Sequence, residues 1–105
     1  MRVAYIAGPY RARTPYGISC NINKASDVAA KYWLKGFAVI CPHKNSAMFD
    51  GLAPDNVWLD GYLEIMCRCD VVVMMSGWQL STGAKAEHDE AISLGLEVIY
   101  DGDEK

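Results

Sequence analysis

A run of apolar residues followed by a polar loop and an amphipathic helix is the feature that most constrains how this chain folds. The segment 71–75 is apolar throughout, which is typical of a strand that is covered on both faces of a sheet. Ser81 or Thr82 is suited to cap the helix that follows, and Gly95 is suited to end it. The segment 70–95 therefore predicts a strand, a loop and a helix within a parallel sheet.

Glu87 has an unusual position on this predicted helix. At about 100° per residue, it falls within the same arc as the small and apolar residues of the helix, which are Ala84, Ala91, Leu94 and Gly95. Two interpretations remain open. Glu87 is either a carboxylate at the helix edge, stabilised by the helix N-terminus by about 0.3–1 kcal/mol, or a group that faces a ligand requiring negative charge.

Strand and helix patterns alternate along the rest of the chain. The further predicted elements are strands and helices at 2–7, 21–35, 37–41, 55–68 and 97–100. This alternation predicts an α/β fold with a single domain over residues 1–105. The expected architecture is a doubly wound, Rossmann-like or flavodoxin-like sheet of about four parallel strands with helices on both faces. The segment 101–105 is expected to form a frayed tail.

Helical periodicity predicts which side chains of these helices pack in the core. In the first helix, Tyr32 and Trp33 are expected to be packing residues. In the second helix, the expected buried stripe consists of Trp58, Leu59, Tyr62, Ile65 and Met66. Asp60 lies on the opposite face of that helix, so periodicity alone predicts that its carboxylate is solvated.

Three loops contain the residues that point to ligand binding. These loops are 8–17, 42–54 and 76–83. In an open parallel sheet, ligands bind beyond the carboxyl ends of the strands, where these loops meet. The first loop holds Tyr10 and two arginines, Arg11 and Arg13, whose planar guanidinium groups suit phosphate. The second holds His43 just past a strand end. The alternative for the first loop is a solvated turn that binds no ligand. The alternative for His43 is a hydrogen-bonded loop histidine.

Composition and charge argue against several classes of function. The net charge is −3, which argues against a nucleic-acid polymer as partner. No apolar run approaches the ~20 residues of a membrane span, and a strand pattern follows Met1 without a signal peptide, so we expect a cytoplasmic protein without membrane contact. The four cysteines fit neither a disulfide framework nor a zinc site, and we expect reduced thiols. We expect no metal.

Four blocks of sequence occur in order along nearly the whole chain. They are Tyr5-Ile6-Ala7-Gly8-Pro9-Tyr10, Gly36-x-x-Val39-Ile40-x-Pro42-His43, Cys69-Asp70-x-Val72-Val73 and Ser81-x-Gly83-x-x-x-Glu87. Together they resemble the nucleoside 2-deoxyribosyltransferase-like superfamily, and most closely the nucleoside 5′-monophosphate N-glycosidases and short relatives of them. That superfamily cleaves the bond between a nucleobase and C1′ of the sugar, so the resemblance implies a glycosidase or a transferase.

The resemblance also implies roles for three residues. The family's glutamate nucleophile matches Glu87, because a carboxylate stabilises or captures an oxocarbenium-like C1′. The acid that helps the base to leave matches Asp60, although the periodicity of its helix places Asp60 in solvent. The tyrosine that orients the glutamate matches Tyr5, with Tyr10 as a less favoured match.

The residue at position 81 distinguishes two branches of the superfamily that the chain resembles. Deoxyribosyltransferases tend to have an aspartate six residues before the nucleophile, whereas this chain has Ser81, as the monophosphate N-glycosidases do. The Ser81 hydroxyl and the amides of Gly83 and Ala84 at a helix N-terminus suit an anion. Gly8, Tyr10, Arg11, Arg13 and His43 complete the expected binding residues.

The function that follows is hydrolysis of the base–sugar bond of a (deoxy)nucleoside 5′-monophosphate by Glu87. This chemistry needs no cofactor or metal, and the expected partners are a small nucleotide or nucleoside and further copies of the chain in a homodimer or larger homo-oligomer. Two alternatives stay open. One is base exchange by a nucleoside 2-deoxyribosyltransferase, and the other is a nucleotide-binding module without catalysis.

Overall fold

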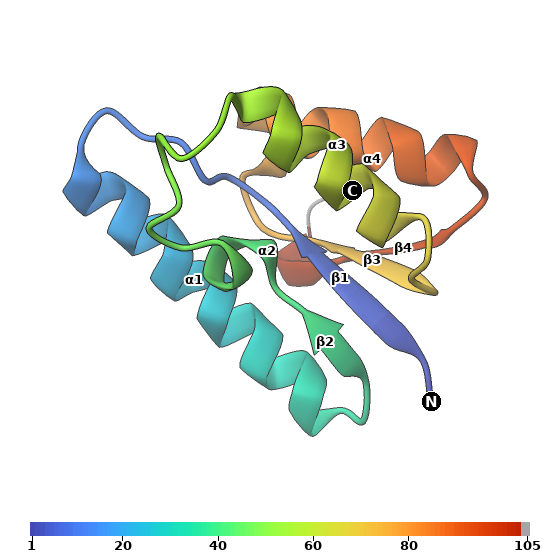
Figure 1. Ribbon diagram of the computed structural model, residues 1–105. Coiled ribbons are helices and arrows are strands. Elements are labelled where there is room, and N and C mark those ends of the chain that lie inside the picture. Colours follow the sequence, from blue (N-terminus) through green and yellow to red (C-terminus); the bar gives the residue numbers. More distant parts are fainter. Residues whose placement is uncertain (104–105) are drawn as a thin grey trace.

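The structure is a computed structural model that describes residues 1–103 (Figure 1). Within these residues, a single parallel sheet has the strand order β2-β1-β3-β4. Its strands are β1 Val3–Ala7, β2 Ala38–Ile40, β3 Val71–Met74 and β4 Glu97–Tyr100. The predicted α/β class and the parallel sheet are confirmed, and the architecture is consistent with a Rossmann-like or flavodoxin-like fold.

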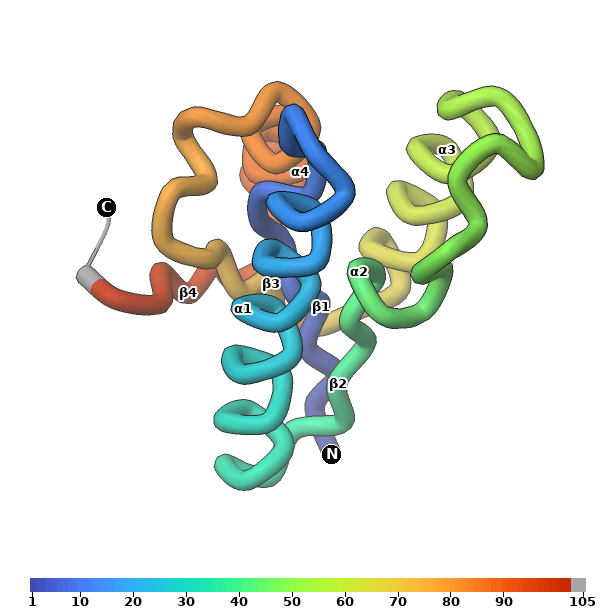
Figure 2. Tube along the Cα trace, turned by 90° about the vertical axis from the view of Figure 1, so that its left-hand side faces the viewer, coloured from blue at the N-terminus to red at the C-terminus, as the bar shows by residue number. Residues whose placement is uncertain are grey.

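Helices connect successive strands and cover both faces of the sheet. They are α1 Pro15–Leu34, α2 Pro42–Asn45, α3 Asp55–Met66 and α4 Thr82–Ser93, with short 3-10 turns η1 Trp78–Leu80 and η2 Asp101–Asp103. In Figure 2, α1 and α3 stand on either side of β1 and β2. Within residues 1–103, none of the helices has the length and apolar character needed to cross a membrane.

Side chains of β1 alternate between two hydrophobic cores, because successive residues of a strand point to opposite faces. Ala4 and Ile6 pack with α1 through Ala25 and Ala29, among others. Tyr5 and Ala7 pack on the other face with Met66 of α3 and with Ala84 and Ala91 of α4. Tyr5 is fully buried, and its place in the central strand points its ring toward the α3 and α4 layer.

The register of the sheet is held by pairings on both sides of β1. Tyr5 lies opposite Ile40 of β2 and Val72 of β3. Asp70 accepts a hydrogen bond from the Val3 amide at 2.8 Å through its Oδ2 atom. This contact fixes the start of β3 against the start of β1.

The caps of α4 confirm the local signals in the sequence, whereas α1 starts earlier than predicted. Ser81 is the N-cap of α4, and Gly95 follows its last turn with a φ of 73°. α1 begins at Pro15 because Thr14 accepts a hydrogen bond from the Gly17 amide at 3.0 Å and caps the helix. The predicted loop 8–17 is therefore shorter than expected.

Two predicted packing surfaces are more exposed than expected. Trp33 is 55% exposed and Leu59 is also 55% exposed. The helical turn places Tyr32, which is buried, against the sheet and directs Trp33 outward. In α3 only Met66 is buried. Tyr62 is partly buried against the core, whereas Trp58 and Leu59, nearer the start of the helix, line a cavity beyond the sheet edge.

Asp101 is anchored rather than frayed. Its carboxylate forms an ion pair with Lys31 at 2.5 Å and accepts a hydrogen bond from the Tyr32 hydroxyl at 3.2 Å. Because these contacts tie the end of β4 to α1, the expected tail does not begin at this residue. Residues 104–105 of that predicted tail lie outside the described residues.

Gly8 lies where the end of β1 meets Met75, and the structure predicts that a larger residue is not tolerated there. A Cβ added at Gly8 would lie 2.7 Å from the Met75 Cβ, whereas one added at Gly61 of α3 would meet no atom within 4 Å. Gly8→Ala should lower the free energy of unfolding by about 1–3 kcal/mol. As a matched control, Gly61→Ala should raise it by about 0.5–1 kcal/mol through helix propensity. Urea unfolding of both variants tests this; equal stabilities would contradict the close approach.

Candidate functional site

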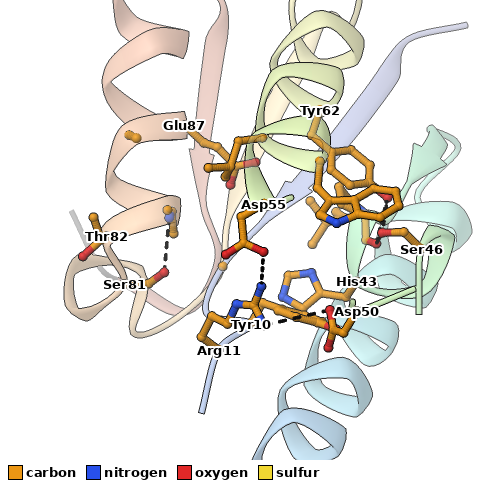
Figure 3. A pocket seen from close by; sticks show the side chains of 18 of the residues that line it. Tyr10, Arg11, His43, Ser46, Asp50, Asp55, Tyr62, Ser81, Thr82 and Glu87 are labelled. Carbon is orange, nitrogen blue, oxygen red and sulfur yellow. Dashed lines mark hydrogen bonds and ion pairs between the residues drawn. The ribbon is translucent and has the colours of Figure 1, made fainter. Parts of the chain in front are cut away.

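A cavity of 440 Å³ lies at the carboxyl edge of the sheet. It is enclosed by the loop after β1, the long connection between β2 and α3, and the first turns of α3 and α4. Figure 3 shows its side chains pointing toward a common centre. Its polar lining residues are Tyr10, Arg11, His43, Ser46, Asp50, Asp55, Tyr62, Ser81, Thr82 and Glu87. The place is the one expected for a ligand in a doubly wound fold.

Glu87 is desolvated in this cavity and held by Tyr5. Its Oε2 atom accepts a hydrogen bond from the Tyr5 hydroxyl at 2.5 Å. Burial raises the pKa of Glu87 from 4.5 to about 7, and the Tyr5 hydrogen bond opposes part of that rise. Burial and the Glu87 charge also raise the pKa of Tyr5, so Tyr5 remains the proton donor. Glu87 is therefore a cavity carboxylate that titrates near neutrality, not a solvated residue at the helix edge.

The start of α4 forms the wall beside Glu87. The Ser81 Oγ atom accepts a hydrogen bond from the Ala84 amide at 3.2 Å. Ser81, Gly83 and Ala84 all line the cavity, one turn before Glu87. The structure thus brings together the serine, the helix N-terminus and the glutamate that the sequence predicted as neighbours. Gly8 also lines the cavity, at the end of β1.

A polar network links the loop after β1 to the segment before α3. The Arg11 guanidinium forms an ion pair with Asp55 at 2.8 Å and lies 3.9 Å from the Asp50 carboxylate. The Tyr10 hydroxyl donates to Asp50, with distances of 3.0 and 3.2 Å to its two oxygens. Arg13, also predicted as a binding residue, is exposed and does not line the cavity.

His43 is a packed residue of the cavity wall. It lies on α2, is 6% exposed, and its Nε2 atom is 2.8 Å from the Pro9 carbonyl oxygen. Because a carbonyl only accepts, Nε2 carries the proton and Nδ1 keeps a lone pair, which has no partner among the described residues. Burial lowers the pKa of His43, so the ring is neutral at neutral pH. His43 is thus a hydrogen-bonded histidine, on α2 rather than in a loop, and it also lines the cavity, so its contact with a ligand stays a prediction.

The predicted second carboxylate is not at the site. Asp60 is exposed and does not line the cavity, because it projects from the outer face of α3, as its periodicity predicted. The structure therefore does not bring Asp60 to the cavity, and the role that the resemblance implies for it stays a prediction. Asp55, at the first turn of the same helix, lines the cavity instead. The signal in the sequence that could have identified Asp55 is its position right after the long loop, at the start of α3.

Aromatic side chains from α3 and the preceding loop form an apolar wall that sequence analysis missed. Phe49 and Trp58 lie with their ring centroids 5.8 Å apart, and both line the cavity. Tyr62 donates a hydrogen bond to Ser46 at 2.6 Å, which fixes one end of the wall. The apolar stripe of α3 thus faces the cavity in part, which explains why it is not fully buried.

Other reactive side chains form no second centre within residues 1–103. All four cysteines are free thiols, of which Cys69 is buried and Cys67 exposed. No group of three or more His, Cys, Asp or Glu side chains in this part of the chain is arranged to hold a metal ion.

Comparison with known proteins places the chain in a family. The model of a family described as a domain of unknown function, DUF4406, matches residues 2–100. The chain belongs to this family. The match spans every strand and the whole cavity, so the site described above lies within the DUF4406 domain. No curated protein matches the sequence.

The raised pKa of Glu87 predicts how stability depends on pH. The folded chain keeps the Glu87 proton up to a pH of about 7, whereas the ordinary value is 4.5. This contribution to stability is therefore complete below pH 4.5 and is lost as the pH rises through about 7. Glu87→Gln, which stays neutral, should be more stable than the native chain at pH 8 by about 1–3 kcal/mol and nearly equal to it at pH 4. Urea unfolding at both pH values measures the difference; a less stable Gln variant at pH 8 would contradict it.

Proposed function

We propose that this chain is an N-glycosidase that hydrolyses the base–sugar bond of a (deoxy)nucleoside 5′-monophosphate, with Glu87 as the nucleophile. The observation that carries the proposal is a single carboxylate that is desolvated, titrates near pH 7 and is oriented by the Tyr5 hydroxyl inside a ligand-sized cavity. The order of the four sequence blocks that resemble nucleotide N-glycosidases supports the same reaction.

The reaction has two steps in which Glu87 first forms and then loses a bond to the sugar. The Glu87 carboxylate oxygen bonds to C1′ while the C1′–N bond breaks and its electron pair leaves with the base, which takes up a proton. Water then attacks C1′ of the glycosyl ester, giving the free sugar phosphate, and Glu87 leaves as a carboxylate. Tyr5 holds the reacting oxygens throughout by donating its hydroxyl proton in a hydrogen bond.

The walls of the cavity fit the two ends of a nucleotide. Phe49, Trp58 and Tyr62 offer aromatic faces and edges, which suit a nucleobase because every base has a π-face. On the opposite side, Ser81 and the first amides of α4 suit an anion. Glu87 lies between these two walls on α4 (Figure 3), as a nucleophile at C1′ must lie between base and phosphate.

Asp55 takes the role in this proposal that the resemblance gave to Asp60. It is the carboxylate that lines the cavity from α3, across from Glu87. In the resting chain it is paired with Arg11, but its side chain is 70% exposed, and such exposed pairs exchange partners at little cost. Asp55 is thus available to hydrogen-bond the leaving base.

Further copies of the chain are part of the proposal. Large apolar side chains on α3 and in the segment that supplies Phe49 and Asp50 to the cavity are exposed, with Met48 at 93%, Leu52 at 71% and Leu59 at 55%. Exposed apolar surface, where it is contiguous, marks interaction sites in proteins. A homodimer that uses this surface would also close the open side of the cavity.

Release of free base tests the nucleophile. The purified chain, incubated with ribo- and deoxyribonucleoside 5′-monophosphates and their nucleosides, should release base from at least one monophosphate, detected by chromatography. Glu87→Gln should lower the rate by at least about 10³-fold, since no covalent step remains. Glu90→Gln, an exposed carboxylate on the same helix, should stay within about twofold of the native rate.

The products and controls separate the proposal from its alternatives. Base release that is equal in the native chain and Glu87→Gln would overturn the nucleophile assignment. Release that requires a second free base as acceptor would indicate a transferase. Binding of nucleotide, seen as a rise in melting temperature, without release from any substrate would indicate a binding module.

Variants of Asp55 and Asp60 test which of the two acts as the second carboxylate. Both are aspartates of α3, but only Asp55 lines the cavity. Asp55→Asn should lower the rate of base release about 10²-fold, the usual size of a contribution from proton handling. Asp60→Asn should leave the rate within about twofold, because its side chain is solvated. The opposite ranking would restore the role that the resemblance assigned to Asp60.

A further inference from the structure

A second cavity adjoins the first on the α1 side of the α4 N-terminus. It has a volume of 580 Å³ and lies between the end of β3, the loop that contains Gly77, and Asn21 and Lys24 of α1. Arg11, Ser81, Thr82 and Gly83 line both cavities. A ligand that passes over the start of α4 would therefore occupy the two cavities together.

The two cavities differ in charge. The lining of the first contains three carboxylates, those of Asp50, Asp55 and Glu87, against the single cation of Arg11. The lining of the second contains two cations, Arg11 and Lys24, and no carboxylate. The electrostatic attraction for an anionic group is therefore stronger in the second cavity than in the first.

The groups that border the second cavity are available to an anion. Lys24 forms no ion pair with any residue in the described part of the chain, 1–103. Arg11 has exposed partners only, so a phosphate can displace them at small cost. The amides of Thr82 and Gly83, in the first turn of α4, have no acceptor within the helix, and the helix dipole adds to their attraction for an anion.

The second cavity has room and cations for more than one phosphate. Its volume is 580 Å³, and Arg11 from the loop after β1 and Lys24 from α1 line it from two different elements. We infer that the second cavity is a phosphate subsite for a nucleoside 5′-diphosphate or a longer 5′-phosphoryl chain. Arg11 and the α4 amides contact the first phosphate, and Lys24 contacts the next. This inference rests on the proposed function and extends its substrate class.

Nucleotide binding to a variant that does not hydrolyse the nucleotide tests the phosphate subsite separately from the reaction. Glu87→Gln is titrated calorimetrically with the common ribo- and deoxyribonucleoside 5′-monophosphates and with the matching diphosphates, in EDTA so that no metal ion bridges the phosphates. At least one diphosphate should bind about tenfold more tightly than its monophosphate, a difference of about 1.4 kcal/mol. Adding Lys24→Ala should remove this preference, and Lys24→Glu should reverse it. Lys35→Ala, a charge change at the end of the same helix and outside both cavities, should keep it.

The outcomes distinguish this inference from the function on which it rests. Equal binding of mono- and diphosphates, or equal effects of Lys24→Ala and Lys35→Ala, would overturn the diphosphate subsite while Glu87-dependent base release from a monophosphate still stands. A diphosphate preference that depends on Lys24, without any base release by the native chain, would support the subsite and overturn the glycosidase. Absence of binding by every nucleotide would overturn both.

Discussion

The parallel pairing of β1 with β3 is the constraint on which the rest of the structure depends. Because both strands run in the same direction, their following loops leave the sheet at the same edge. The chain after β1 turns to α1 on one face, and the chain after β3 turns to α4 on the other face. This divergence opens the space in which ligands bind in doubly wound folds, and both cavities of this protein lie there.

The Tyr5–Glu87 hydrogen bond shows how the core supports a reactive group at that edge. Tyr5 is fixed by strand pairing on both sides and by complete burial, so its hydroxyl has little freedom. The same burial that makes Tyr5 rigid removes water from Glu87 and raises its pKa. The free energy of unfolding at neutral pH is therefore lowered, and the Glu87 carboxylate is held in a fixed orientation. Such a conflict between local stability and charge placement is a mark of functional sites.

Local signals predicted the fold better than the site. The strand at 97–100 was predicted with the bounds that the structure has. Glu87 was recognised as unusual from its helix. Both predictions were possible because periodicity and helix caps depend on residues that are close in the sequence. The cap that starts α1 at Pro15 was also visible in the sequence and was missed. Asp60 was assigned from the resemblance, against the periodicity of its own helix. Asp55 was not recognised as a cavity residue, because the path between β2 and α3 is irregular. No periodic pattern shows where such a connection directs its side chains.

The difference in charge between the two cavities bears on the orientation in which the proposed nucleotide binds. In the proposed reaction, Glu87 and Asp55 place negative charge where the sugar carbon becomes positive, so the transition state is stabilised more than the neutral ground state. The same carboxylates disfavour a phosphate beside them, so the proposal places the phosphate at the start of α4. The N-terminus of α4, between the two cavities, allows one short segment to bind the anion and to carry the nucleophile one turn later. Under the proposed function, this difference in charge sets the orientation of the substrate, because a reversed nucleotide would place its phosphate beside Glu87.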